Sequence, residues 1–198
     1  MDRSRTNEPS DPLDVRLVGR DSEVEAVLGV VSADSGDLAR VVLLAGEPGV
    51  GKSRLAREIV SLVPHRTVWS TCWEGDEAPS FWPWLQVLRA VRPVHPGAGS
   101  DARGSLDQLL GIVREGDAHE NRFALFDAFA RAIEEWTSGE HALVVMDDLQ
   151  WADAGSIRLL RFLAADVRAR RLTVIGAYRD EVDGPGRSVA AAAKAQWA

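Results

Sequence analysis

A glycine-rich loop between a strand and a helix constrains this 198-residue chain more than any other feature. The apolar run before it, residues 40–45, predicts a buried strand, and residues 53–63 after it predict an amphipathic helix. The loop follows the pattern G-x-x-x-x-G-K-S and, with the next residue, comprises Gly46, Glu47, Pro48, Gly49, Val50, Gly51, Lys52, Ser53 and Arg54. This order of strand, loop and helix predicts a site for phosphate groups.

The loop residues suit a nucleoside triphosphate with a magnesium ion. Glycines let successive backbone N–H groups turn inward, and the helix N-terminus adds a partial positive charge. Lys52 is then expected to reach the β- and γ-phosphates, and the Ser53 hydroxyl to bind Mg²⁺. The sequence has 21 arginines but only two lysines, so a lysine at the position that needs a compact charge favours this interpretation over a simple glycine turn.

Length and composition narrow the class of protein. The length suits one α/β domain, and an apolar fraction of 45% is enough for a core. No run of about 18 apolar residues and no apolar leader occurs, so we expect no membrane span and a cytoplasmic location. Cys72 is the single cysteine, which excludes an internal disulfide. The net charge of −7 argues against a broad nucleic-acid-binding face, and no direct DNA binding is expected.

Strand and helix patterns alternate along the chain. Further strands are predicted at 67–72, 142–146 and 172–177. Helices are predicted over 53–63, around Pro83, from Ser105 and over 122–136. Two more are predicted to begin after Asp21 and Asp153, each of which would act as an N-cap. Leu62 is expected on the apolar face of the helix at 53–63, and Val167 on that of the helix after Asp153. This alternation implies an α/β fold, a three-layer sandwich in which helices cover both faces of a mostly parallel sheet.

Two acidic residues follow the predicted strand at 142–146. In an open parallel sheet, ligand groups gather at the carboxyl ends of strands, so Asp147 and Asp148 are expected near the glycine-rich loop. An apolar run that ends in an acid is the Walker B pattern, in which Asp147 would hold Mg²⁺ through water. Asp148 would orient or polarise the water that attacks the γ-phosphate. The alternative is an acidic turn after a buried strand.

Two further polar residues lie where they could join this site. Arg179 follows the strand predicted at 172–177 and is expected to point toward the same strand ends, where it could sense the γ-phosphate. A solvated arginine is the alternative interpretation. Gln150 lies just beyond the acid pair, and a water-positioning role and a simple packing turn fit its place equally well.

Five segments occur in an order that resembles a known family of ATPases. They are LVGRDSE (17–23), GEPGVGKS (46–53), the stretch from WEG to FWPW (73–84), LVVMDDLQWAD (143–153) and GAYRDE (176–181). Together they resemble the ATPase module of large LuxR-type bacterial transcriptional regulators, which belong to the STAND class of AAA-like P-loop ATPases. The resemblance covers residues 15–182. It implies a P-loop NTPase fold in which the strand before Arg179 lies between the strands before the loop and before Asp148.

The resemblance also implies a function and a set of site residues. ATP would be the nucleotide, with Gly19 and Arg20 near its adenine and ribose, and Lys52, Asp148 and Arg179 would act in hydrolysis. The module would switch between ATP and ADP states and signal to protein partners or through self-association. The competing hypothesis is a catalytically inactive P-loop scaffold or interaction module, for which seven tryptophans would supply a surface.

The sequence departs from the family pattern in two ways. The residues after the Arg179 segment do not resemble the helical lid expected there, which suggests a truncated product without the lid. Residues 183–198 are expected to form a loosely attached tail, and 1–14 a disordered lead-in. No arginine finger can be assigned, and such fingers contribute about 10³-fold or more in rate, so we expect slow ATP hydrolysis at best.

Overall fold

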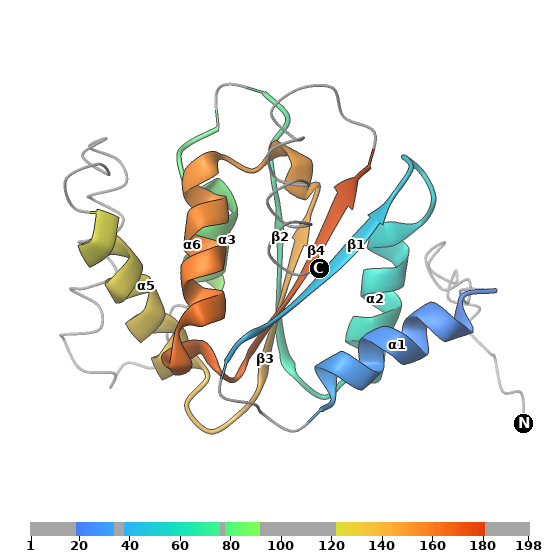
Figure 1. Ribbon diagram of the computed structural model, residues 1–198, viewed down its shortest axis with the longest axis horizontal. Helices are drawn as coiled ribbons and strands as arrows, with labels where there is room; N and C mark the ends of the chain where they lie inside the picture. The colour runs from blue at the N-terminus through green and yellow to red at the C-terminus, as the bar shows by residue number, and fades with distance from the viewer. Residues whose placement is uncertain (1–18, 34–37, 76–77, 92–121, 181–198) are drawn as a thin grey trace, which may run out of the picture.

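The computed structural model is built around a four-stranded parallel sheet with helices on both faces (Figure 1). It describes residues 19–33, 38–75, 78–91 and 122–180. The strands are β1 (Arg40–Gly46), β2 (Arg66–Thr71), β3 (Ala142–Asp147) and β4 (Leu172–Arg179), in the sheet order β1-β4-β3-β2. The helices are α1 (Asp21–Val31), α2 (Lys52–Leu62), α3 (Trp82–Val91), α5 (Arg122–Trp136) and α6 (Ala154–Ala165), with 3₁₀ turns η1 (Leu149–Trp151) and η2 (Val167–Ala169). The predicted α/β three-layer fold is confirmed, and β4 lies between β1 and β3 as the resemblance implied.

Alternation of side chains along the strands builds two separate cores. Helices α1 and α2 cover one face of the sheet, and α3, α5 and α6 cover the other (Figure 1). In β3, Leu143 and Val145 pack in the core with α1 and α2, whereas Val144 and Met146 pack in the core with the other three helices. Because both faces of this strand are buried, its sequence is a continuous apolar run rather than an alternating one.

Three predicted details of the helices are wrong. Asp21 is the first residue of α1 and not its N-cap, because Arg20 occupies that position and no side chain caps the helix. Leu62 is exposed, because the buried stripe of α2 runs through Leu55, Ala56 and Ile59 and leaves the last helical residue at its margin.

The third error concerns the end of α6. This helix stops at Ala165, where Asp166 accepts a hydrogen bond from the backbone N of Arg168 and starts η2 instead. Val167 therefore lies in η2 with an exposed side chain. The helix predicted from Ser105 lies outside the described residues. None of the described helices is long and apolar enough to cross a membrane.

Asp153 fixes the start of α6 and ties it to the segment before α3. Its Oδ1 accepts a hydrogen bond from the backbone N of Ser156 at 3.0 Å, which confirms the predicted N-cap. Its Oδ2 accepts hydrogen bonds from Ser156 Oγ and, at 3.0 Å, from the backbone N of Phe81. Phe81 has a φ of 61°, a left-handed conformation that is unfavourable for a bulky side chain. The Asp153 carboxylate thus stabilises a strained residue as well as a helix end.

Replacing Asp153 with alanine should destabilise the domain. The variant loses the N-cap of α6 and the hydrogen bond that holds Phe81, a combined cost of about 2 kcal/mol. In a domain of this size, that loss lowers the Tm by about 4–8 °C in thermal denaturation followed by circular dichroism. Asp153→Asn retains one acceptor oxygen and should show a smaller decrease. An unchanged Tm for Asp153→Ala would contradict this role.

Candidate nucleotide-binding site

Three strands deliver the predicted site residues to one edge of the sheet. β1, β4 and β3 are parallel neighbours, and their carboxyl ends lie together at the top of Figure 1. Gly46 at the end of β1 pairs with Arg179 at the end of β4, and Asp147 ends β3. The glycine-rich loop, the acid pair and Arg179 therefore lie at the same edge, where open parallel sheets bind their ligands.

The glycine-rich loop enters α2 through two glycines in the left-handed region. Gly49 has a φ of 76° and Gly51 a φ of 93°, values that L side chains rarely adopt. Gly51 is also the N-cap of α2 and has no side chain to bind the free N–H groups of the first turn. A Cβ built at either glycine meets nothing within 4 Å, so the space beside the loop is open. Free N–H groups and open space at a helix N-terminus favour an anion.

Lys52 holds its positive charge against this loop. Its Nζ donates hydrogen bonds to the backbone oxygen of Gly46 at 3.0 Å and of Glu47 at 2.9 Å. Neutral carbonyls are weaker acceptors for an ammonium group than phosphate oxygens are. A bound phosphate would therefore compete well for the same donor.

Arg20 connects the turn before α1 to the same loop. Its Nη2 donates a hydrogen bond to the backbone oxygen of Val50 at 2.6 Å. Gly19, the preceding residue, has a φ of 78°. The structure thus brings this turn to the loop, where the resemblance implies contacts with adenine and ribose. Those contacts stay a prediction.

The acid pair lies at a sharp turn. Asp147 is the last residue of β3, and its Oδ1 accepts a hydrogen bond from the backbone N of Asp148 at 3.0 Å. Asp148 has a φ of 53° and is the N-cap of η1, so the chain leaves the sheet immediately after β3. The Asp148 side chain is 40% exposed, which leaves its carboxylate accessible to water and ligand.

Gln150 links the acid pair to the end of β4. Its side chain is almost fully buried, with 1% of the residue exposed. Its Nε2 donates a hydrogen bond to Asp148 Oδ1 at 2.8 Å, and its Oε1 accepts one from the backbone N of Arg179 at 3.2 Å. The Nη2 of Arg179 lies 3.6 Å from the same Asp148 oxygen. Gln150 therefore holds Asp148 and Arg179 next to each other, a role beyond that of a packing turn.

A glycine inside β4 allows this network to sit directly on the sheet. A Cβ at Gly176 would lie only 2.8 Å from Leu149 Cδ2 and 3.1 Å from Leu43 Cδ2. Leu149 comes directly before Gln150 and is buried against β4, so a side chain at Gly176 would force the ends of the Leu149 and Leu43 side chains to move. Sequence reasoning missed this residue. The signal was present, because a glycine inside an apolar strand often marks a close approach of another segment.

The residues present fit a magnesium ion bound together with a triphosphate. Ser53 lies in the first turn of α2 and Asp147 at the end of β3, and both carry the oxygen ligands that Mg²⁺ prefers. Among the described residues, no group of three or more His, Cys, Asp or Glu could hold a metal ion. Mg²⁺ usually keeps several waters and binds through few protein groups together with substrate phosphates, which fits the pair of Ser53 and Asp147.

Solved structures from two archaea are similar to this chain. Cdc6p from Pyrobaculum aerophilum is 20% identical with a TM-score of 0.54, and the match covers 92% of this chain and 45% of that one. A Walker-type ATPase of Pyrococcus abyssi is 14% identical with a TM-score of 0.47, over 84% of this chain and 48% of that one. Likeness at such identities shows the fold alone. The chain spans less than half the length of either protein.

Comparison by sequence identifies the family. Among curated proteins, none matches this sequence. The family model described as AAA ATPase domain matches residues 16–175, which include the glycine-rich loop, the acid pair and the first half of β4. The chain therefore belongs to the AAA ATPase domain family.

Proposed function

We propose that this domain binds ATP with Mg²⁺ at the glycine-rich loop, hydrolyses it slowly and acts as a nucleotide-dependent switch. The observation that carries the proposal is the meeting of Lys52, Asp148, Gln150 and Arg179 at the ends of three adjacent strands. Membership of the AAA ATPase domain family supports nucleotide binding. Together they favour a site that binds phosphate next to groups able to direct water.

The residues of this edge have separate tasks in the proposal. The N–H groups of the loop and Lys52 Nζ bind the β- and γ-phosphates. Ser53 and Asp147 hold Mg²⁺, which neutralises phosphate charge when bound. Asp148 orients the attacking water, and Arg179 senses the γ-phosphate. We expect slow turnover because no arginine finger could be assigned in the sequence.

Gln150 is a positioning residue in this scheme. Both ends of its amide are bound by protein groups, Asp148 at Nε2 and the backbone N of Arg179 at Oε1. An amide held in this way is better suited to fix a neighbouring carboxylate than to bind the attacking water itself. Its effect on hydrolysis would therefore pass through Asp148.

Within the AAA ATPase domain family, we infer that this domain belongs to the STAND class of regulators. This inference rests on five segments that occur in the family's order between residues 17 and 181. In such a regulator ATP and ADP favour different conformations through different contacts, and the change passes to protein partners or to other copies of the chain. The acidic net charge of −7 supports protein contacts rather than nucleic-acid contacts for this domain.

A catalytically inactive scaffold is the second candidate. The observation that favours it is that the two cations beside the loop already have acceptors within the protein: Lys52 donates to the carbonyls of Gly46 and Glu47, and Arg20 to that of Val50. A domain stabilised in this way could keep its fold without a nucleotide. Binding and turnover measurements separate the two candidates.

Saturating ATP with Mg²⁺ should raise the Tm of the wild-type protein. At a ligand concentration of about 100 times Kd, binding adds about 2.7 kcal/mol to the free energy of unfolding, equivalent to about 5–11 °C. Lys52→Ala should lose most of this increase, and EDTA should reduce it in the wild type. Arg170→Ala, which removes an exposed charge at the other end of β4, is the matched control and should keep the increase. A wild-type Tm that ATP and Mg²⁺ leave unchanged would refute the proposal.

Asp148→Asn should retain nucleotide binding but lower turnover by about 10²-fold, because the amide cannot accept a proton from the attacking water.

Gln150→Ala should lower kcat by about tenfold with little change in KM, because Gln150 touches Asp148 rather than the nucleotide. Phosphate release at varied ATP concentration measures both parameters.

A double-mutant cycle tests whether Gln150 acts through Asp148. In the Asp148→Asn background, Gln150→Ala should cost little more, because the group that it positions is already gone. Gln86→Ala is a matched control: this glutamine binds the backbone of Thr71 at the end of β2, and its loss should leave kcat near the wild-type value. Additive effects of the Asp148 and Gln150 variants would show that the two residues act independently.

A further inference from the structure

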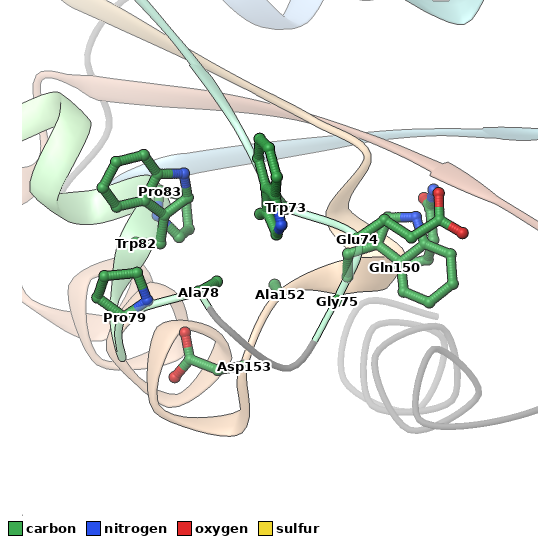
Figure 2. A pocket seen from close by; sticks show the side chains of 12 residues that line it. Trp73, Glu74, Gly75, Ala78, Pro79, Trp82, Pro83, Gln150, Ala152 and Asp153 are labelled. Atoms are coloured by element: carbon green, nitrogen blue, oxygen red, sulfur yellow. The ribbon is translucent and has the colours of Figure 1, made fainter.

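A pocket with a volume of about 490 Å³ opens beside the ends of β2 and β3 (Figure 2). β2 lies at the opposite edge of the sheet from β1, and none of residues 46–53 lines this pocket. Sites for small molecules have volumes of about 300–1,000 Å³. The pocket is therefore large enough for a ligand and separate from the phosphate loop.

Tryptophans and carboxylates line this pocket. Figure 2 shows Trp73 above the opening, Trp82 on one side, Glu74 and Gln150 on the other, and Asp153 below. Trp151 is a third tryptophan of the lining, and the described lining residues include no lysine, arginine or histidine. Aromatic walls together with carboxylates are surroundings that favour a positively charged ligand.

Trp73 leaves a large aromatic surface unused at the mouth of the pocket. It is 61% exposed, and among the described residues no cation lies over its ring. The faces of indole rings are negative and attract cations. Trp82 illustrates this attraction, since the guanidinium of Arg89 lies 5.3 Å from the centre of its ring. A ligand that covered Trp73 would gain both burial of apolar surface and the attraction of its ring.

Carboxylates line the pocket and lie close to it. The Asp153 carboxylate is fixed by hydrogen bonds to Phe81 and Ser156 and cannot turn away. Burial raises the pKa of the Cys72 thiol to about 12, and the charges of Asp153, Asp148 and Asp147 add to this increase. Cys72 lines the pocket, so the same charges act on whatever enters it. They repel phosphates and attract cations.

We propose that this pocket binds a small organic cation of the guanidinium or alkylammonium class, with Trp73 covering its apolar part and Glu74 pairing with its charge. Glu74 is exposed, and within the described part of the chain it forms no ion pair. Asp153 adds fixed negative charge below the ligand. Binding at this site requires neither ATP nor Mg²⁺.

The test uses n-butylguanidinium and its neutral isostere n-butylurea at constant ionic strength and without nucleotide. The seven indole N–H signals of the full ¹⁵N-labelled chain are followed by NMR and assigned by single Trp→Phe substitutions. The guanidinium should shift the signals of Trp73, Trp82 and Trp151, and butylurea should bind about tenfold more weakly. Equal shifts with both compounds, or no shift of these three signals, would overturn the proposal.

Matched charge variants test the role of Glu74. Glu74→Gln should weaken guanidinium binding by about two- to fivefold, as loss of an exposed ion pair predicts. Glu135→Gln removes the same charge from an exposed site at the end of α5 and should leave the Kd unchanged. Equal weakening by both variants would show only a general response to net charge and would contradict the proposal.

A third experiment tests whether the bound cation is a free small molecule or the side chain of a protein partner. N-acetylarginine amide carries the same guanidinium as an arginine side chain of a protein. Affinity equal to or below that of butylguanidinium supports a free small molecule, because the added backbone groups then contribute nothing. Binding of the arginine derivative that is tenfold tighter or more would place the cation on a protein partner and overturn the small-molecule assignment.

Discussion

The pairing of β4 with both β1 and β3 is the constraint on which the candidate site depends. This pairing brings Arg179 beside Gly46 and places its backbone N against Gln150 Oε1. The register is fixed from both faces, since Val174 packs in one core and Ile175 in the other. A slip of one residue would exchange the two faces and break the link to Gln150. The geometry of the site is therefore a consequence of how the core packs.

Local patterns predict most of the fold and the phosphate loop, because those features are encoded by neighbouring residues. Continuous apolar runs predicted the buried strands, and Gly49 and Gly51 marked the loop. Gln150 could not be assigned in this way, because one of its partners lies at Arg179, twenty-nine residues further along the chain. Leu62 was misplaced for a related reason: residue type alone does not show where a helix leaves the core.

Gln150 belongs to both sites at this edge of the sheet. It lines the pocket beside the ends of β2 and β3 and also donates a hydrogen bond to Asp148 in the candidate nucleotide site. A ligand that moved the Gln150 amide would change the position of the Asp148 carboxylate, so occupancy of one site would alter the other. Couplings between sites are typically worth about 1–3 kcal/mol and are reciprocal for binding. Bound nucleotide would then change the affinity of the pocket for its ligand by the same factor.

Positive and negative side chains lie in different parts of the sheet edge formed by the carboxyl ends of the strands. The part at β1 carries Lys52, Arg20 and the N-terminus of α2, which suit an anion. The part at β2 and β3 carries Glu74 and Asp153. A triphosphate and an organic cation would therefore each be attracted to one part and repelled from the other. Arg179 Nη2 lies 3.6 Å from Asp148 Oδ1. This ion pair lies between the two parts, so a ligand charge bound in either part would act on it.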